Sequence, residues 1–310
     1  MINVPQHAFY AMCLVLALLL LATVIRLTLK ACNPSRDYTE LRQRIQSWWV
    51  MIGILFFVLL ASKNVAIVFF GFISFLALKE FLSIVPTRHA DRRAVFWAYL
   101  SIPVQYYWVS MGWYGMFIIF IPVYVFLFIP IRMVLIGETR GFIASAGVLH
   151  WALMLTVFSI SHIAYLLMLP DKNNLAGGMG LIIFLIFCTQ FNDVAQYVWG
   201  KLFGRHKIIP KVSPNKTWEG FVGGLLTVAV FASFIAPWLT PLSWREGLVV
   251  GLIIAVAGFM GDLVISSVKR DLQIKDTGQL IPGHGGLLDR MDSLMYTAPL
   301  FFHFIYYLHY

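Results

Sequence analysis

Residues 9–29 read FYAMCLVLALLLLATVIRLTL, a run in which Arg26 is the only charged side chain. A helix rises 1.5 Å per residue, so a run of this length spans about 30 Å, the thickness of the hydrocarbon core of a bilayer. No basic segment precedes the run and no obvious cleavage site follows it. We therefore expect a retained transmembrane helix and no secretory signal peptide.

The rest of the chain repeats this pattern. Hydrophobic residues make up 60% of the 310 residues, charged residues make up 12%, and the mean hydropathy is +0.81. Further apolar runs cover 47–62, 65–85, 94–111, 114–136, 146–169, 176–199, 220–240, 247–268 and 294–309. A β-barrel would instead need short alternating strands. The sequence predicts an all-α polytopic membrane protein of about nine to ten transmembrane helices, with N-terminal transmembrane helices in 1–170 and a second, C-terminal transmembrane region in 171–310 that contains the stretch 266–292.

The basic residues predict the orientation of these helices. With the N-terminus outside, 20 of the 23 lysines and arginines fall in or beside cytoplasmic connections, as the positive-inside rule requires. Basic loops also orient membrane proteins and contact anionic headgroups, so they need no further function. Nucleic acid is an unlikely partner, because no soluble domain carries a basic face. The two connections richest in charge, 201–219 and 266–292, are predicted to face the cytoplasm, where nucleotides are found.

Two carboxylates lie inside predicted spans, at Asp193 and Asp262. Both are roughly 10 Å below the charged ends of their helices at 1.5 Å per residue, so they share a depth. A carboxylate in a membrane normally lines a wet cavity and pairs with a cation. Oxygen donors without clustered Cys or His favour Mg²⁺, which binds one or two carboxylates together with substrate phosphates. The alternative is a protonated carboxyl bonded to a neighbouring helix.

Residues 211–220 read KVSPNKTWEG, just before a predicted span. Lys211 and Lys216 provide positive charge for phosphate groups, while Ser213 and Thr217 provide hydroxyl donors beside the start of a helix. The pattern predicts a phosphate-binding loop. A turn followed by a capped helix would look the same.

Residues 266–292 read SSVKRDLQIKDTGQLIPGHGGLLDRMD. Gly283, Gly285 and Gly286 surround His284, and glycines allow backbone amides to approach a ligand closely. Asp289 and Asp292 are three residues apart, which places both on one face of a helix. Lys269, Arg270 and Lys275 add positive charge for a polyanion. A glycine-rich re-entrant turn is the structural alternative.

This stretch resembles the signature of the CDP-diglyceride synthetases, or phosphatidate cytidylyltransferases. The matching positions are Ser266, Lys269, Arg270, Lys275, Asp276, Gly278, Ile281, Pro282, His284, Gly285, Gly286, Asp289, Arg290 and Asp292. Residues 190–220 and the GDL at 261–263 also resemble the family pattern, so the resemblance covers about 190–295. The N-terminal half resembles the family only as a series of spans.

The resemblance implies transfer of CMP from CTP to membrane phosphatidate, giving CDP-diacylglycerol and pyrophosphate in phospholipid biosynthesis, with Mg²⁺ as cofactor. It implies a multi-pass protein of the cell membrane, in bacteria the inner membrane, and is compatible with a homodimer. It assigns catalysis to Asp262, Lys269 and Asp289, metal binding to Asp193, Asp262, Asp289 and Asp292, and substrate binding to Lys211, Ser213, Lys216, Thr217, Arg270, Lys275, His284, Gly285, Gly286 and Arg290.

Three positions depart from the family pattern. Val194 replaces a threonine beside Asp193, Gln196 replaces a small residue, and Ile265 stands where the family commonly has Glu. A divergent paralogue acting on another lipid phosphate therefore stays open. Two different activities also stay open: a CTP-dependent lipid alcohol kinase and, less favoured because no internal repeat is visible, a secondary transporter.

Overall fold

The computed structural model describes residues 4–35, 37–172, 175–278 and 285–310, and these fold into helices joined by loops, without a β-sheet. The helices are α1 (Gln6–Cys32), α2 (Thr39–Ala61), α3 (Lys63–Ile84), η1 (His89–Asp91), α4 (Arg92–Ser110), α5 (Tyr114–Ile119), η2 (Phe120–Val125), α6 (Phe126–Val134), α7 (Phe142–Leu153), η3 (Met154–Phe158), α8 (Ser159–Tyr165), η4 (Leu166–Met168), α9 (Gly177–Phe203), α10 (Trp218–Leu239), α11 (Trp244–Asp271) and α12 (Leu288–His309). The all-α prediction is confirmed.

Each predicted span corresponds to one long helical segment. Two segments are composite: α5, η2 and α6 follow one another without a loop, as do α7, η3, α8 and η4. The turns at η2 and η3 are π-helical, and η2 contains Pro122, which has no backbone N–H to donate to the helix. Eight segments in the described part of the chain are long and apolar enough to cross a membrane, while α4 and α12 are more polar. The chain is a multi-pass membrane protein.

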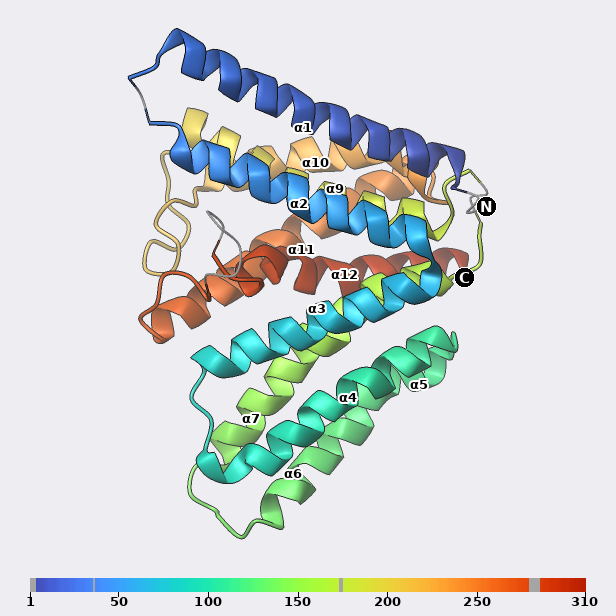
Figure 1. Cartoon of the computed structure of the whole chain (residues 1–310), viewed down its shortest axis with the longest axis vertical. Helices are drawn as coiled ribbons and strands as arrows, with labels where there is room; N and C mark the ends of the chain where they lie inside the picture. Colours follow the sequence, from blue (N-terminus) through green and yellow to red (C-terminus); the bar gives the residue numbers. More distant parts are fainter. Residues whose placement is uncertain (1–3, 36, 173–174, 279–284) are drawn as a thin grey trace.

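The segments lie side by side as a bundle, with both termini at the same end (Figure 1). The opposite end carries the loops whose described residues are 33–35 with 37–38, 85–91, 135–141, 204–217, and 272–278 with 285–287, which alternate along the chain with those at the terminal end. We call this end the basic end, because the sequence places most lysines and arginines in or beside these loops. The alternation is the one that the positive-inside prediction requires, and the side of the membrane stays a prediction.

One hydrophobic core connects both halves of the chain, from Met12 in α1 to Ile305 in α12. Large apolar side chains also cover the outside of the bundle, including Phe57, Phe72 and Phe234, as expected for a surface that faces lipid. Helix α1 lies at the edge of the bundle, where only Ala8 and Met12 of its residues are buried (Figure 1). The proposed division at residue 170 stays a prediction.

Candidate active site

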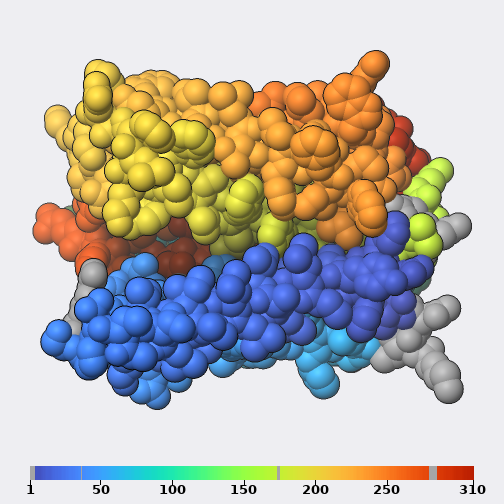
Figure 2. All heavy atoms as spheres, turned by 90° about the horizontal axis from the view of Figure 1, so that it is seen from above, coloured from blue at the N-terminus to red at the C-terminus, as the bar shows by residue number. Residues whose placement is uncertain are grey.

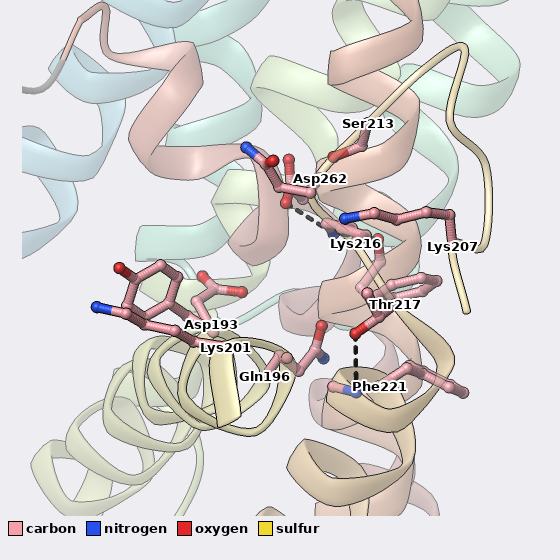
Figure 3. Close-up of a pocket in the computed structure, with 14 residues that line it drawn as sticks. Asp193, Gln196, Lys201, Lys207, Ser213, Lys216, Thr217, Phe221 and Asp262 are labelled. Atoms are coloured by element: carbon pink, nitrogen blue, oxygen red, sulfur yellow. Dashed lines mark hydrogen bonds and ion pairs between the residues drawn. The ribbon is translucent and has the colours of Figure 1, made fainter. Parts of the chain in front are cut away.

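A cavity of about 580 Å³ opens at the basic end between α9, α10 and α11 (Figure 3). Helix α9 and helix α11 contribute the two carboxylates that sequence analysis singled out, and the 204–217 loop contributes lysines and hydroxyls. The lining residues are Asp193, Gln196, Tyr197, Gly200, Lys201, Lys207, Ser213, Asn215, Lys216, Thr217, Gly220, Phe221, Phe259 and Asp262. The cavity therefore joins the two sequence features, intramembrane aspartates and a lysine-rich loop, that were predicted separately.

The 204–217 loop has a defined shape because both of its ends are fixed to α10. The Thr217 side chain accepts a hydrogen bond from the Gly220 N–H at 3.2 Å and so caps the N-terminus of α10. The Glu219 carboxylate accepts from the backbone N–H groups of Arg205 and His206. Arg270 in α11 donates from Nε to the Val212 carbonyl at 3.1 Å. These contacts hold the loop over the cavity mouth.

Lys216 and Asp262 form the central ion pair of the cavity, with 2.7 Å between Nζ and Oδ2. The ammonium also lies 4.3 Å from the centre of the Phe259 ring, a cation–π distance. The Ser266 hydroxyl donates to the other oxygen of Asp262 at 3.1 Å. Both paired side chains keep some exposure, 17% for Lys216 and 30% for Asp262. A cation thus already sits at the Asp262 carboxylate, on a face open to a ligand.

Asp193 reaches the same cavity from α9 (Figure 3). The hydroxyl of Ser293 lies 3.4 Å from each of its oxygens and 3.1 Å from the Gly258 carbonyl, so this side chain links α9, α11 and α12. Helices α11 and α12 cross tightly here: any Cβ at Gly261 would collide with the backbone carbonyl of residue 292. The crossing brings the carboxylates of residues 193, 262 and 292 within electrostatic reach of one another.

No three His, Cys, Asp or Glu side chains in the described ranges converge closely enough to form a complete metal site. Asp193 and Asp262 face one cavity, and their oxygen donors suit Mg²⁺. Two protein carboxylates fit the usual mode of Mg²⁺ binding, in which substrate phosphates and water supply the remaining ligands. Magnesium stays a prediction.

Asp289 belongs to a different arrangement, outside the cavity wall. Its Oδ1 accepts from Lys269 Nζ at 2.7 Å. Its Oδ2 accepts from the Thr277 backbone N–H at 2.9 Å and from the Gly286 N–H at 3.0 Å, and the Thr277 hydroxyl lies 2.9 Å from it. The carboxylate is buried and protein donors contact both of its oxygens. These partners fit a residue that fixes the backbone around Thr277 and Gly286, whereas the family resemblance assigned it a catalytic and metal-binding role.

Sequence analysis missed Glu80, which joins the same arrangement from α3. Its two carboxylate oxygens accept from the Leu287 N–H at 2.8 Å and the Leu288 N–H at 3.0 Å, at the N-terminus of α12. The Thr277 hydroxyl lies between this carboxylate and that of Asp289 and donates its single proton to one of them at a time. A carboxylate here satisfies helix donors that have no intrahelical partner and complements the helix dipole. The sequence does mark Glu80, since it is an acidic residue inside the predicted apolar run 65–85.

Gly285 and Gly286 are both required by this arrangement. Gly285 has φ +80°, a left-handed conformation that other residues rarely adopt. A Cβ at Gly286 would collide with the Glu80 carboxylate and the Thr277 hydroxyl. We call Glu80, Lys269, Thr277, Gly286 and Asp289 the loop anchor.

The remaining predicted residues are dispersed. Ser213, Lys216 and Thr217 line the cavity, but Lys211 and Lys275 are absent from the wall formed by described residues. Lys201 and Lys207 line it and were not predicted as site residues. His284 lies outside the described residues, and Arg290 lines a second cavity, between α1, α2 and α9.

Residues 42–308 match the model of the Cytidylyltransferase family, and the chain belongs to this family. It is 44% identical over 291 residues to "Uncharacterized protein YnbB" of Escherichia coli, a match that covers 94% of this chain and 96% of the relative. It is 43% identical over 131 residues to the phosphatidate cytidylyltransferase of Staphylococcus saprophyticus and 43% identical over 121 residues to that of Mycobacterium leprae. These two matches cover 40% and 39% of this chain, and 48% and 39% of the relatives. The chain is therefore a membrane-embedded nucleotidyltransferase by family.

Proposed function

We propose that this protein transfers CMP from CTP to phosphatidate, giving CDP-diacylglycerol and pyrophosphate. The observation that carries the proposal is the Lys216–Asp262 pair in a cavity that Asp193 and two further lysines also line. A nucleoside triphosphate needs cations around its phosphates, and this cavity supplies three ammonium groups beside two carboxylates. Phosphatidate as the acceptor is supported by the names of the relatives in Staphylococcus and Mycobacterium.

The reaction needs no strong protein base. The second pKa of a phosphate monoester is about 6, so the acceptor is largely dianionic at neutral pH and its oxygen attacks the α-phosphorus of CTP directly. The bond from the α-phosphorus to the α,β-bridging oxygen breaks, and pyrophosphate leaves with that electron pair. The protein must therefore hold two anions in line and stabilise the charge of the leaving group. Lys216 and Lys207 are positioned for this task in the cavity, and Lys201 adds positive charge for the triphosphate at its exposed rim.

Magnesium, when bound, would supply additional positive charge for the triphosphate. Asp193 and Asp262 are the residues we propose to hold it, because they face one cavity and leave room for phosphate ligands. The approach of a nucleotide would draw Lys216 from the carboxylate toward the phosphates, since the flexible ammonium serves either anion. Ser266 and Ser293 would then continue to orient the two aspartates through their hydroxyl groups.

We further propose that the basic end faces the cytoplasm of a bacterial cell membrane. The cavity opens at that end, so CTP would enter from the compartment in which it is made. The lysines and arginines around the same end satisfy the positive-inside rule.

The proposal is tested with purified protein in nanodiscs, cytidine-labelled CTP, Mg²⁺ and phosphatidate. We expect a lipid that carries labelled CMP, together with one pyrophosphate for each lipid formed. Release of CDP with phosphorylation of a lipid alcohol would instead identify a kinase. Absence of labelled lipid with phosphatidate, while the Staphylococcus saprophyticus relative produces it under the same conditions, would overturn phosphatidate as the acceptor.

A further inference from the structure

A second cavity, of about 600 Å³, lies between α1, α2 and α9. Its walls are mainly aliphatic and aromatic, with Leu18 and Leu19 from α1, Ile52 and Phe56 from α2, and Phe187 from α9. Figure 2 looks onto α1, in blue, and shows the surface hollowed between it and the yellow part of the chain, which includes the end of α9, with atoms of the C-terminal part of the chain, in red, deep in the hollow at the basic end. We call this cavity the side groove.

The side groove adjoins the candidate active site, because Asp193 and Tyr197 line both cavities. Two arginines line the same groove, Arg44 from α2 and Arg290 from α12. The Arg290 Nε is buried without a hydrogen-bond partner among the described residues, although a buried guanidinium donor normally has one. Arg44 forms an exposed pair with Glu40, so Arg290 is the available cation.

We propose that the side groove holds the acyl chains of the lipid phosphate acceptor, with its phosphomonoester between Arg290 and Asp193. This inference rests on the proposed function and adds to it the site of the second substrate. Charge complementarity favours this occupant over a neutral bilayer lipid, since a dianionic phosphate would satisfy the unpaired Arg290 donor and an apolar chain would cover the groove wall. Because Asp193 lines both cavities, a phosphomonoester beside it would place the attacking oxygen next to the nucleotide.

The dimensions fit an acyl chain. From Ile183 to Tyr197, both in the wall, α9 rises about 21 Å at 1.5 Å per residue. One leaflet contributes half of the hydrocarbon thickness, about 15 Å. A chain whose headgroup lay at Asp193 would therefore run along the wall toward the middle of the membrane.

Helix α1 gives this groove a wall that lies outside the region matching the family model. The family match begins at residue 42, whereas α1 ends at Cys32, so one wall of the groove lies outside the matched region. We infer that α1 selects acyl chains: its residues Val15, Leu18 and Leu19 set the width and depth of the groove, while the nucleotide chemistry belongs to α9–α12.

Photocrosslinking tests the site without requiring catalysis. The probe is phosphatidate with a diazirine in one acyl chain, placed in phosphatidylcholine nanodiscs without CTP. We expect labelled peptides to contain residues 15–19 and 183–194, and unlabelled phosphatidate to suppress this labelling. Equal suppression by additional phosphatidylcholine, or equal labelling of the outward-facing Leu20 and Leu21, would show an ordinary bilayer lipid and overturn the proposal.

Kinetics test the role of α1. Val15→Trp fills the deep part of the groove, and Leu20→Trp adds the same side chain on the exposed face of the same helix. We expect Val15→Trp to raise the KM for dipalmitoyl phosphatidate about tenfold, equivalent to about two CH₂ groups left unburied, with unchanged KM for dioctanoyl phosphatidate and CTP. Leu20→Trp should change none of these. Equal effects on both lipids would refute chain selection by α1.

The outcomes separate the two proposals. Groove labelling by phosphatidate in a protein that transfers no CMP would leave the lipid site intact and refute the proposed function. CMP transfer without groove labelling would refute the lipid site alone.

Discussion

The cavity and the loop anchor contain similar side chains but use them differently. In the cavity, Asp262 pairs with Lys216 and both remain partly exposed, while Asp193 has a long contact with Ser293. In the loop anchor, Asp289 and Glu80 accept from protein donors on both oxygens. A carboxylate with free capacity can bind a ligand, whereas one that is fully hydrogen-bonded fixes the backbone around it. The difference separates residues that would act on substrate from residues that shape the site.

The largest expected effect is that of Asp262→Asn. The substitution keeps the size of the side chain and removes the charge that holds Lys216, and we expect activity to fall about 10²- to 10³-fold, the usual cost of losing one preorganised electrostatic contact. Thermal unfolding should change little, because the pair is partly exposed. CMP transfer and the melting temperature would be measured together. Asp37→Asn, an exposed aspartate in the 33–38 loop, is the matched control, and wild-type activity for Asp262→Asn would remove that residue from the site.

A smaller loss of activity is expected for Glu80→Gln, about 10- to 100-fold, because Glu80 acts through the loop and not on substrate. The amide keeps one acceptor oxygen, so one of the two N–H groups at Leu287 and Leu288 loses its partner. Hydrogen exchange at these amides should accelerate. Glu40→Gln, an exposed glutamate, should leave both activity and exchange unchanged. Lost activity with normal amide protection would mean that Glu80 contacts substrate itself.

The smallest effect is expected at the rim of the cavity. Lys201 is exposed beside Tyr197, so Lys201→Gln should raise the KM for CTP a few-fold and leave kcat unchanged. The effect should shrink as salt is raised, because exposed charges are screened with a Debye length of about 8 Å at physiological ionic strength. Steady-state kinetics at two salt concentrations measure it, with Lys30→Gln as an exposed control on α1. A salt-independent fall in kcat would place Lys201 with Asp262 and not at the rim.

Hydropathy was sufficient to predict the helices, because the length and composition of an apolar run follow directly from the thickness of the membrane. Asp193 and Asp262, which the sequence predicts to share a depth, line one cavity, and their role there stays a prediction. The prediction of the helices and that of a shared depth each use local sequence with one physical constraint, the thickness of the membrane or the rise of a helix per residue.

The loop anchor could not be assembled in this way. Glu80 and Leu287 are 207 positions apart, and no local pattern states which helix N-terminus a distant carboxylate will cap. The family resemblance likewise marked Asp289 as important without distinguishing a ligand from a structural acceptor. Only the hydrogen-bond donors around the Asp289 carboxylate distinguish a ligand-binding residue from a structural acceptor. Glu80 was nevertheless within reach of sequence reasoning, since the rule applied to Asp193 and Asp262 applies equally to an acid in 65–85.

The wall that α9 shares between the two cavities has an energetic consequence. Its Asp193–Tyr197 segment borders a polar space on one side and an apolar space on the other. Moving a lipid chain from membrane into water costs about 0.8 kcal/mol for each CH₂ group. A lipid lying across this segment would expose its headgroup to a water-soluble reagent in the polar space, while its acyl chains stayed in the apolar space. The polar and apolar spaces therefore meet along α9. The headgroup reaches the polar space without the acyl chains leaving the bilayer.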